Sequence, residues 1–200
     1  MTIEPGGVWG EPAAGAVGGR AVSKASTDAE VAALALAGHD VIELTSFGGD
    51  LARTVGVEQR RPEAERHAYP FDLGLVRLDD RDELPFVAGL VARRALWRGE
   101  FALVANGGWL GRWYIGPKAH PNDGRLDVTV GALGPVQRFL ASRRLPTGTH
   151  LPHPDLTTRR TDAWDHRFSS PVTVSIDRVA VGRAHSIRVS VRADCFMLVV

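Results

Sequence analysis

A glycine turn in the first quarter of the chain carries residue types that suit phosphate binding. Gly48, Gly49 and Asp50 follow an apolar run, and Arg53 comes three residues later. Glycines let backbone N–H groups approach a phosphate closely, and a helix that begins after them favours negative charge at its start. On the glycines alone, an ordinary strand-to-helix turn is the simpler explanation. These four residues are candidate phosphate ligands whose role depends on the rest of the chain.

Two aspartates lie in segments whose composition favours turns. Asp123 belongs to an Asn-Asp-Gly run, and Asp177 lies between two apolar segments. A carboxylate with neighbouring carbonyl oxygens can hold a hard cation such as Mg²⁺, and a carboxylate beside a hydroxyl can accept its proton. Plain hairpin turns use the same residue types. The residues themselves therefore leave both interpretations open.

The N-terminal part of the chain predicts a small α/β unit that positions the glycine turn. The first 26 residues are rich in Gly, Pro and Ala and are expected to be irregular. Ser26 or Thr27 can cap a helix that Gly38 ends. The expected order is a helix over 28–37, a buried strand over 41–47, the glycine turn and a helix over 51–55.

The rest of the chain, after a charged linker over 58–67, predicts an antiparallel β-rich part. Short β-prone runs alternate with Gly, Pro, Asp and Asn clusters. One helix over 134–144 interrupts them, with Val136, Phe139 and Leu140 on one face. The sequence thus predicts an α+β fold, in which a small α/β segment (1–57) packs on a larger β-sandwich-like domain (58–200). The expected strands are 71–78, 85–92, 101–105, 126–130, 172–176, 187–191 and 196–200.

Three segments, taken in order, resemble the catalytic domain of the diacylglycerol kinase family, which includes the soluble YegS-like lipid kinases. Residues 48–56, Gly-Gly-Asp-Leu-Ala-Arg-Thr-Val-Gly, are similar to the family's Gly-Thr-Gly-Asn-Asp-Leu-Ala-Arg-Thr-Leu-Gly segment. Residues 106–128 contain Asn-Gly-Gly and Pro-Asn-Asp-Gly-Arg-Leu-Asp, which resemble its glycine-rich strand pair. Residues 171–183 resemble the strand that bears its Asp-Gly-Glu motif. The resemblance runs from about residue 40 to the C-terminus and implies an NAD kinase/diacylglycerol kinase-like fold.

The resemblance also implies roles for particular residues. Asp177 falls on the aspartate that serves as general base on the lipid hydroxyl. Asp123 and the carbonyl of Arg125 fall on the groups that bind magnesium. ATP and Mg²⁺ are the implied cofactors, and a lipid such as diacylglycerol at a membrane surface is the implied substrate. Gly48, Gly49, Asp50 and Arg53 would lie near the nucleotide.

Two departures from the family pattern indicate a shortened chain with degenerate motifs. The residues upstream of the glycine turn do not spell the family's Gly-Gly-Asp-Gly-Thr phosphate loop, so one glycine loop is expected where the family has two. In the Asp-Gly-Glu motif, Arg178 replaces glycine and Val179 replaces glutamate. Arginine takes a left-handed turn less easily than glycine, and valine cannot orient a base. Loss of one such charged group commonly lowers catalysis by about 100-fold.

The composition limits the classes of partner and the cellular location that we expect for this protein. The formal charge is +1, from 24 basic and 23 acidic residues, so no net field favours nucleic acid. Cys195 is the only cysteine, which excludes an internal disulfide and a Cys-rich metal site. The N-terminus does not resemble a secretory signal, and no apolar run reaches the length of a membrane span. A cytoplasmic protein with peripheral membrane contact is the expectation.

The sequence does not decide whether three of the tryptophan side chains lie at a membrane surface or in the protein core. Trp97, Trp109 and Trp113 lie near several arginines and would suit either a membrane surface or a core with arginines around it.

Three functions remain open at this stage. The first is a lipid kinase that transfers the ATP γ-phosphoryl group to a lipid hydroxyl. The second is a non-catalytic homologue that binds a lipid, a nucleotide or a protein on the same scaffold. A relative of NAD kinase is a weaker third. A homodimer or a partner chain could supply the missing phosphate loop.

Overall fold

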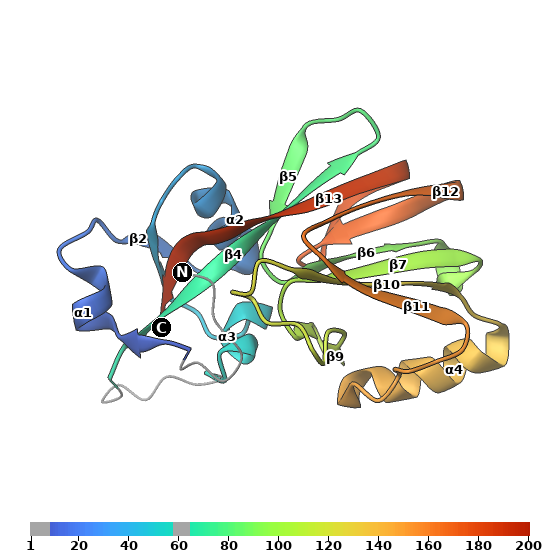
Figure 1. Cartoon of the computed structure of the whole chain (residues 1–200), viewed down its shortest axis with the longest axis horizontal. Coiled ribbons are helices and arrows are strands. Elements are labelled where there is room, and N and C mark those ends of the chain that lie inside the picture. The colour runs from blue at the N-terminus through green and yellow to red at the C-terminus, as the bar shows by residue number, and fades with distance from the viewer. Residues whose placement is uncertain (1–8, 58–64) are drawn as a thin grey trace.

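The computed structural model describes residues 9–57 and 65–200 (Figure 1). The linker expected from residue 58 and the boundary expected at residues 57 and 58 fall largely on 58–64, outside the described residues. Four α-helices accompany a mostly antiparallel sheet within the described part of the chain. None of these helices has the length and apolar character needed to cross a membrane. The helices are α1 (Ala13–Val17), α2 (Asp28–Leu36), α3 (Asp50–Thr54) and α4 (Pro135–Arg144).

Two long strands run through both ends of the molecule and hold it together (Figure 1). β4 (His67–Leu78) pairs antiparallel with β13 (Val179–Val199) along most of its length. The expected strands 187–191 and 196–200 are therefore parts of one strand, with a register irregularity between Arg192 and Phe196. That irregularity leaves room for Asp194, which has a positive φ of 50°.

The sheet continues from β13 through β12 and curls around one core. Its order is β1-β4-β13-β12-β6-β7-β10-β11. Val76 of β4 and Val128 of β10 belong to the same buried cluster although several strands separate them in this order. A sheet can bring such strands into contact only by curling over, as sandwiches and barrels do. The remaining strands are β1 (Glu11–Pro12), β5 (Glu83–Phe86), β6 (Gly89–Arg93), β7 (Glu100–Ala105), β8 (Trp109–Leu110), β9 (Trp113–Tyr114), β10 (Leu126–Ala132), β11 (Leu156–Thr161) and β12 (Ala163–Ile176).

The N-terminal unit is more ordered than its composition suggested. Residues 11–25 hold β1, α1 and β2 (Ser23–Ala25), so the expectation of an irregular segment there was wrong. β2 pairs parallel with β3 (Val41–Leu44), and β3 pairs parallel with the end of β13. Backbone pairing of this kind holds a Gly-rich segment without much side-chain burial. The predicted helix after residue 27 is confirmed as α2, and Thr27 is its cap.

Two features of the β-rich part bear on function. The expected strand 85–92 is interrupted between β5 and β6, at Val87 and Ala88. The predicted helix 134–144 is confirmed as α4, yet none of its ten residues is buried. Its apolar side chains face solvent rather than the core. Near it lie the short 3-10 turns η1 (Ala95–Trp97) and η2 (Leu145–Thr147).

The three tryptophans pack against other rings. Trp97 and Trp113 contact each other at 5.7 Å between ring centroids and pack on a buried apolar cluster. The ring of Trp109 lies 4.7 Å from that of Tyr114.

Candidate functional site

Two strand-to-helix turns lie side by side at one edge of the sheet. β2 leads into α2 and β3 leads into α3, and parallel neighbours bring their carboxyl ends to the same edge. Asp28 Oδ2 accepts a hydrogen bond of 2.7 Å from the backbone N–H of Asp50. The sequence predicts one glycine loop where the family has two, and the turn at 48–50 is the one of this pair that contains glycine. The second turn contains Ser26, Thr27 and Asp28 and has no glycine.

Side chains of the protein accept three backbone N–H groups of these turns, those of Ser26, Glu30 and Asp50. Glu30 Oε2 accepts hydrogen bonds from the N–H and the hydroxyl of Ser26, at 2.6 and 2.8 Å. Thr27 Oγ1 accepts the N–H of Glu30, which completes a capping box. Asp28 takes the N–H of Asp50 in the neighbouring turn. A phosphate group would have to displace internal carboxylates to reach these amides.

Two buried carboxylates meet where the turns touch. Asp50 Oδ1 accepts the N–H of Gly111 at 2.7 Å, while Asp50 Oδ2 and Asp28 Oδ1 are buried without a hydrogen-bond partner. Burial raises the pKa of both carboxyl groups, and the charge of Asp50 raises the pKa of Asp28 further. Each carboxyl group thus keeps one buried oxygen without a donor, and such oxygens disfavour an incoming triphosphate.

Asp177 lies at the first position of a two-residue hairpin turn between β12 and β13. Asp177 and Arg178 have positive φ angles of 44° and 71°, as a type I′ turn requires. The Asp177 carboxylate accepts backbone hydrogen bonds of 2.9 to 3.0 Å from Val87, Ala88 and Gly89. Burial raises its pKa to about 7, against the lowering effect of these three amides. The carboxylate thereby joins the hairpin to the break between β5 and β6.

Three arginines line a cleft beside these turns. Arg53 is held in place, since its Nη1 donates to the Gly111 carbonyl at 2.9 Å and its guanidinium lies 4.2 Å from the ring centroid of Trp109. Arg112 and Arg178 are exposed and also line the cleft. The cleft has a volume of about 370 Å³ and is lined by Phe47, Gly48, Gly49, Asp50, Arg53, Gly111, Arg112 and Arg178.

A second, less polar cavity adjoins the arginine cleft. Its volume is about 450 Å³, and it shares Gly111, Arg112 and Arg178 with the cleft. Val91, Leu110 and Trp113 form its apolar wall. Arg93 also lines the second cavity, so the two spaces together place cationic groups beside apolar side chains.

The structure brings together most of the residues singled out in the sequence. Gly48, Gly49, Asp50 and Arg53 line the cleft, and the turn that contains Asp177 reaches it through Arg178. The Asp177 carboxylate is not among the lining groups. The carboxylate instead interacts with the backbone behind the turn. The glycine turn and the turn of Asp177 therefore lie at the same cleft. The carboxylate of Asp177, however, does not open into it.

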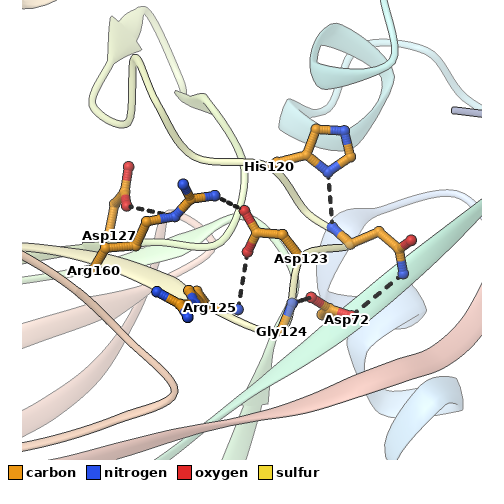
Figure 2. A network of polar contacts seen from close by, with 8 residues as sticks. Asp72, His120, Asp123, Gly124, Arg125, Asp127 and Arg160 are labelled. Carbon is orange, nitrogen blue, oxygen red and sulfur yellow. Dashed lines mark hydrogen bonds and ion pairs between the residues drawn. The ribbon is translucent and has the colours of Figure 1, made fainter. Parts of the chain in front are cut away.

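Asp123 lies in a different network, shown in Figure 2. Its carboxylate pairs with the guanidinium of Arg160 and accepts the N–H of Arg125 at 3.0 Å. Arg160 also lies 3.8 Å from a carboxylate oxygen of Asp127. Within residues 9–57 and 65–200, His, Cys, Asp and Glu form no cluster of three suited to a metal ion. Magnesium at Asp123 and the Arg125 carbonyl stays a prediction, and it would require Arg160 to move.

Asp72 is a buried polar residue that the sequence analysis did not single out. It is fully buried on β4, and its carboxylate accepts the N–H of Gly124 at 2.7 Å (Figure 2). The same carboxylate accepts the N–H of Asp194 at 2.8 Å. The Asn122 side chain donates to Asp194 at 2.9 Å. Asp72 thus joins the turn near Asp123 to the irregular point of β13. In the sequence, the position of this aspartate inside an otherwise apolar predicted strand was the signal that could have identified it.

Comparison with solved structures gives this fold its class. A protein of Bacillus anthracis str. Sterne provisionally assigned as a diacylglycerol kinase matches with TM-score 0.62 and 13% identity, over 88% of this chain and 76% of that one. A diacylglycerol kinase from the same organism matches with TM-score 0.55 and 13% identity, over 78% and 65%. Another provisionally assigned kinase gives 0.53 and 12%, over 78% and 68%.

These likenesses show a diacylglycerol kinase-like fold. No protein-family model matches the sequence, and neither does any curated protein.

Replacing Arg178 with glycine should stabilise the protein. A non-glycine residue at a φ of 71° is strained, and glycine removes that strain. We expect a gain of about 1 kcal/mol, which raises Tm by about 2 to 4 °C for a chain of this size. Thermal unfolding followed by circular dichroism measures it. Arg178→Ala is the matched control, because it removes the guanidinium and keeps the strained φ, and an equal gain in both variants would contradict the strain argument.

Proposed function

We propose that this chain is a lipid-binding protein on a diacylglycerol kinase-like fold that does not transfer phosphoryl groups. The observation that carries the proposal is that Glu30 and Asp28 accept the N–H groups of Ser26 and Asp50, which removes these two turn amides as donors for ATP phosphates. Asp177 supports it as well, because three backbone amides hold its carboxylate behind the turn. Several phosphate-facing donors and an accessible base would both be needed for efficient transfer.

The cleft and its neighbouring cavity support an amphiphilic ligand. Arg112 and Arg178 can pair with a phosphate, while Val91, Leu110 and Trp113 can contact the first carbons of acyl chains. Arginine suits this role because its planar donors match phosphate oxygens. A lipid with a phosphate-bearing head, such as a phosphatidic acid, has this combination of groups.

A lipid kinase remains the second candidate, and one observation favours it. The turn of Asp177 lies beside the glycine turn, and the pKa of Asp177, raised to about 7 by burial, suits a general base at neutral pH. Transfer to a lipid hydroxyl would then need ATP and Mg²⁺, and it would need the Asp28–Asp50 contact to open. A partner chain or second copy would have to supply further phosphate donors.

An ATP-consumption assay with diacylglycerol and Mg²⁺ separates the two candidates. We expect wild type and Asp177→Asn to give the same background rate, because two turn amides are already occupied and backbone amides hold the Asp177 carboxylate behind its turn. Isothermal calorimetry with dihexanoyl phosphatidic acid, a soluble short-chain lipid, should show binding that Arg178→Ala weakens by about tenfold, the loss of one charge-assisted contact.

The exposed Arg188 of β13 provides the matched control. Arg188→Ala changes the same charge away from the cleft, so its affinity should stay within about twofold of wild type, well below the effect of one charge-assisted contact. Turnover that requires Asp177 would refute the non-catalytic proposal. If Arg178→Ala and Arg188→Ala bound the lipid with equal affinity, the cleft would not be the lipid-binding site.

A further inference from the structure

Helix α4 presents an apolar stripe to solvent. Val136, Phe139 and Leu140 follow one another at helical spacing and are 72%, 60% and 46% exposed. A helix of this length in a globular protein normally buries its apolar face, because packing supplies most of its stability. α4 buries none of its residues, and its inner side lines a cavity of about 60 Å³.

Leu96 is a further exposed apolar residue, in a turn that contacts α4. It is 72% exposed, and its carbonyl accepts a hydrogen bond of 2.8 Å from Arg138 on α4. Leu96 and Trp97 both have positive φ angles, 54° and 57°, which are strained for these residues at about 1 kcal/mol each. The strained pair leaves Leu96 in solvent while the Trp97 ring packs on Phe101. The α4–η1 patch consists of Leu96, Val136, Phe139 and Leu140.

The segments that carry the α4–η1 patch are rich in arginine, and the exposed Asp155, which accepts a hydrogen bond from Gln137 of α4, is an acidic neighbour. Residues 93–98 and 135–144 contain six arginines and no acidic residue, in a chain whose formal charge is only +1. The Arg143 guanidinium lies 5.6 Å from the ring centroid of Phe139, so charge and apolar surface are in direct contact. This composition favours a partner that is anionic and apolar at once. The six are Arg93, Arg94, Arg98, Arg138, Arg143 and Arg144.

The small cavity under α4 neighbours the cavity that adjoins the arginine cleft. Trp97 and Trp113 line the small cavity under α4, and Trp113 lines the cavity that adjoins the arginine cleft. The Arg93 guanidinium lies 5.1 Å from the Trp97 ring centroid and faces that same adjoining cavity. A surface that contacts α4 would therefore lie near Trp113, which lines both the cavity under α4 and the cavity beside the arginine cleft.

We propose that the α4–η1 patch docks on an anionic phospholipid bilayer. The four apolar side chains enter the boundary between headgroups and acyl chains, and the arginines pair with lipid phosphates. Each arginine near an anionic surface adds about 1 kcal/mol, and this part weakens with salt. Docking of this kind goes beyond the proposed function, since it requires neither an occupied cleft nor ATP.

Vesicle co-sedimentation of the full chain tests the proposal. We expect binding to vesicles of phosphatidylglycerol and phosphatidylcholine, weak binding to pure phosphatidylcholine, and a decrease as salt rises. Phe139→Glu should lower the partition coefficient by about tenfold or more, because it places a charge in the apolar contact and adds repulsion. Arg143→Gln with Arg144→Gln should lower binding mainly at low salt.

The control variant places the same charge on another helix. Leu36 on α2 is 38% exposed and lies far from α4 (Figure 1), so Leu36→Glu should bind vesicles within about twofold of wild type. Thermal unfolding of each variant confirms that it is folded. Equal binding of Phe139→Glu and wild type would overturn the proposal. So would a dimer in sedimentation velocity that Phe139→Glu dissociates while no form of the protein binds vesicles, because a second copy would then cover the patch.

Discussion

Asp177→Ala should destabilise the protein by about 3 kcal/mol or more, since it leaves the buried N–H groups of Val87, Ala88 and Gly89 without their acceptor. Each buried donor left unsatisfied costs about 1 to 3 kcal/mol, and domains have only about 5 to 15 kcal/mol of stability in total. The expected drop in Tm is about 10 °C. Urea unfolding and thermal unfolding measure the change.

The conservative variant shows whether the carboxylate acts as an acceptor for the backbone. Asp177→Asn keeps one acceptor oxygen, and asparagine tolerates the φ of 44° that this position requires. It should therefore lose distinctly less stability than the alanine variant. If the free energies of unfolding of Asp177→Ala and wild type differed by less than about 1 kcal/mol, the break between β5 and β6 would not depend on Asp177.

The stability that Asp177 contributes should fall as pH rises from about 4 to about 7. Burial raises the pKa of Asp177 from 3.8 to about 7 in the folded protein, so the folded state holds a proton that the unfolded chain has released. Where the folded state binds more protons, the free energy of unfolding decreases with pH. The contribution is fully present below the unfolded pKa and is lost as pH passes the folded pKa. Its size is about 4 kcal/mol over the whole window.

Comparison with Asp177→Asn isolates this pH dependence from that of other groups. His120 and His150 have pKa values lowered by burial, so they oppose the trend below pH 6.5 in both proteins. The difference in free energy of unfolding between wild type and Asp177→Asn should therefore shrink as pH rises from 5 to 8. A difference that is constant over this range would show that the carboxyl group does not change its protonation there.

Local residue chemistry made several elements predictable. A cap at Ser26 or Thr27 and the terminal Gly38 predicted α2, and the alternation of apolar runs with Asn, Asp and Gly predicted most strands. The turn at 177 and the glycine turn at 48 and 49 were also identified. Order along the chain, with the family resemblance, was enough to predict a kinase-like fold.

Long-range contacts decided the rest. Sequence periodicity cannot reveal that Asp28 accepts the N–H of Asp50, because 22 residues separate them and only the parallel pairing of β2 with β3 brings them together.

The amphipathic pattern of α4 predicted a helix correctly. The same pattern does not say whether its apolar face meets a core or solvent, because that depends on where β10 and β11 place the helix. The residues by themselves therefore determined the local structures and their chemical types. Only the tertiary structure decided which amides stay available, which carboxylates are buried and which apolar face remains exposed. The reason is that burial and hydrogen-bond satisfaction depend on neighbours distant in the chain.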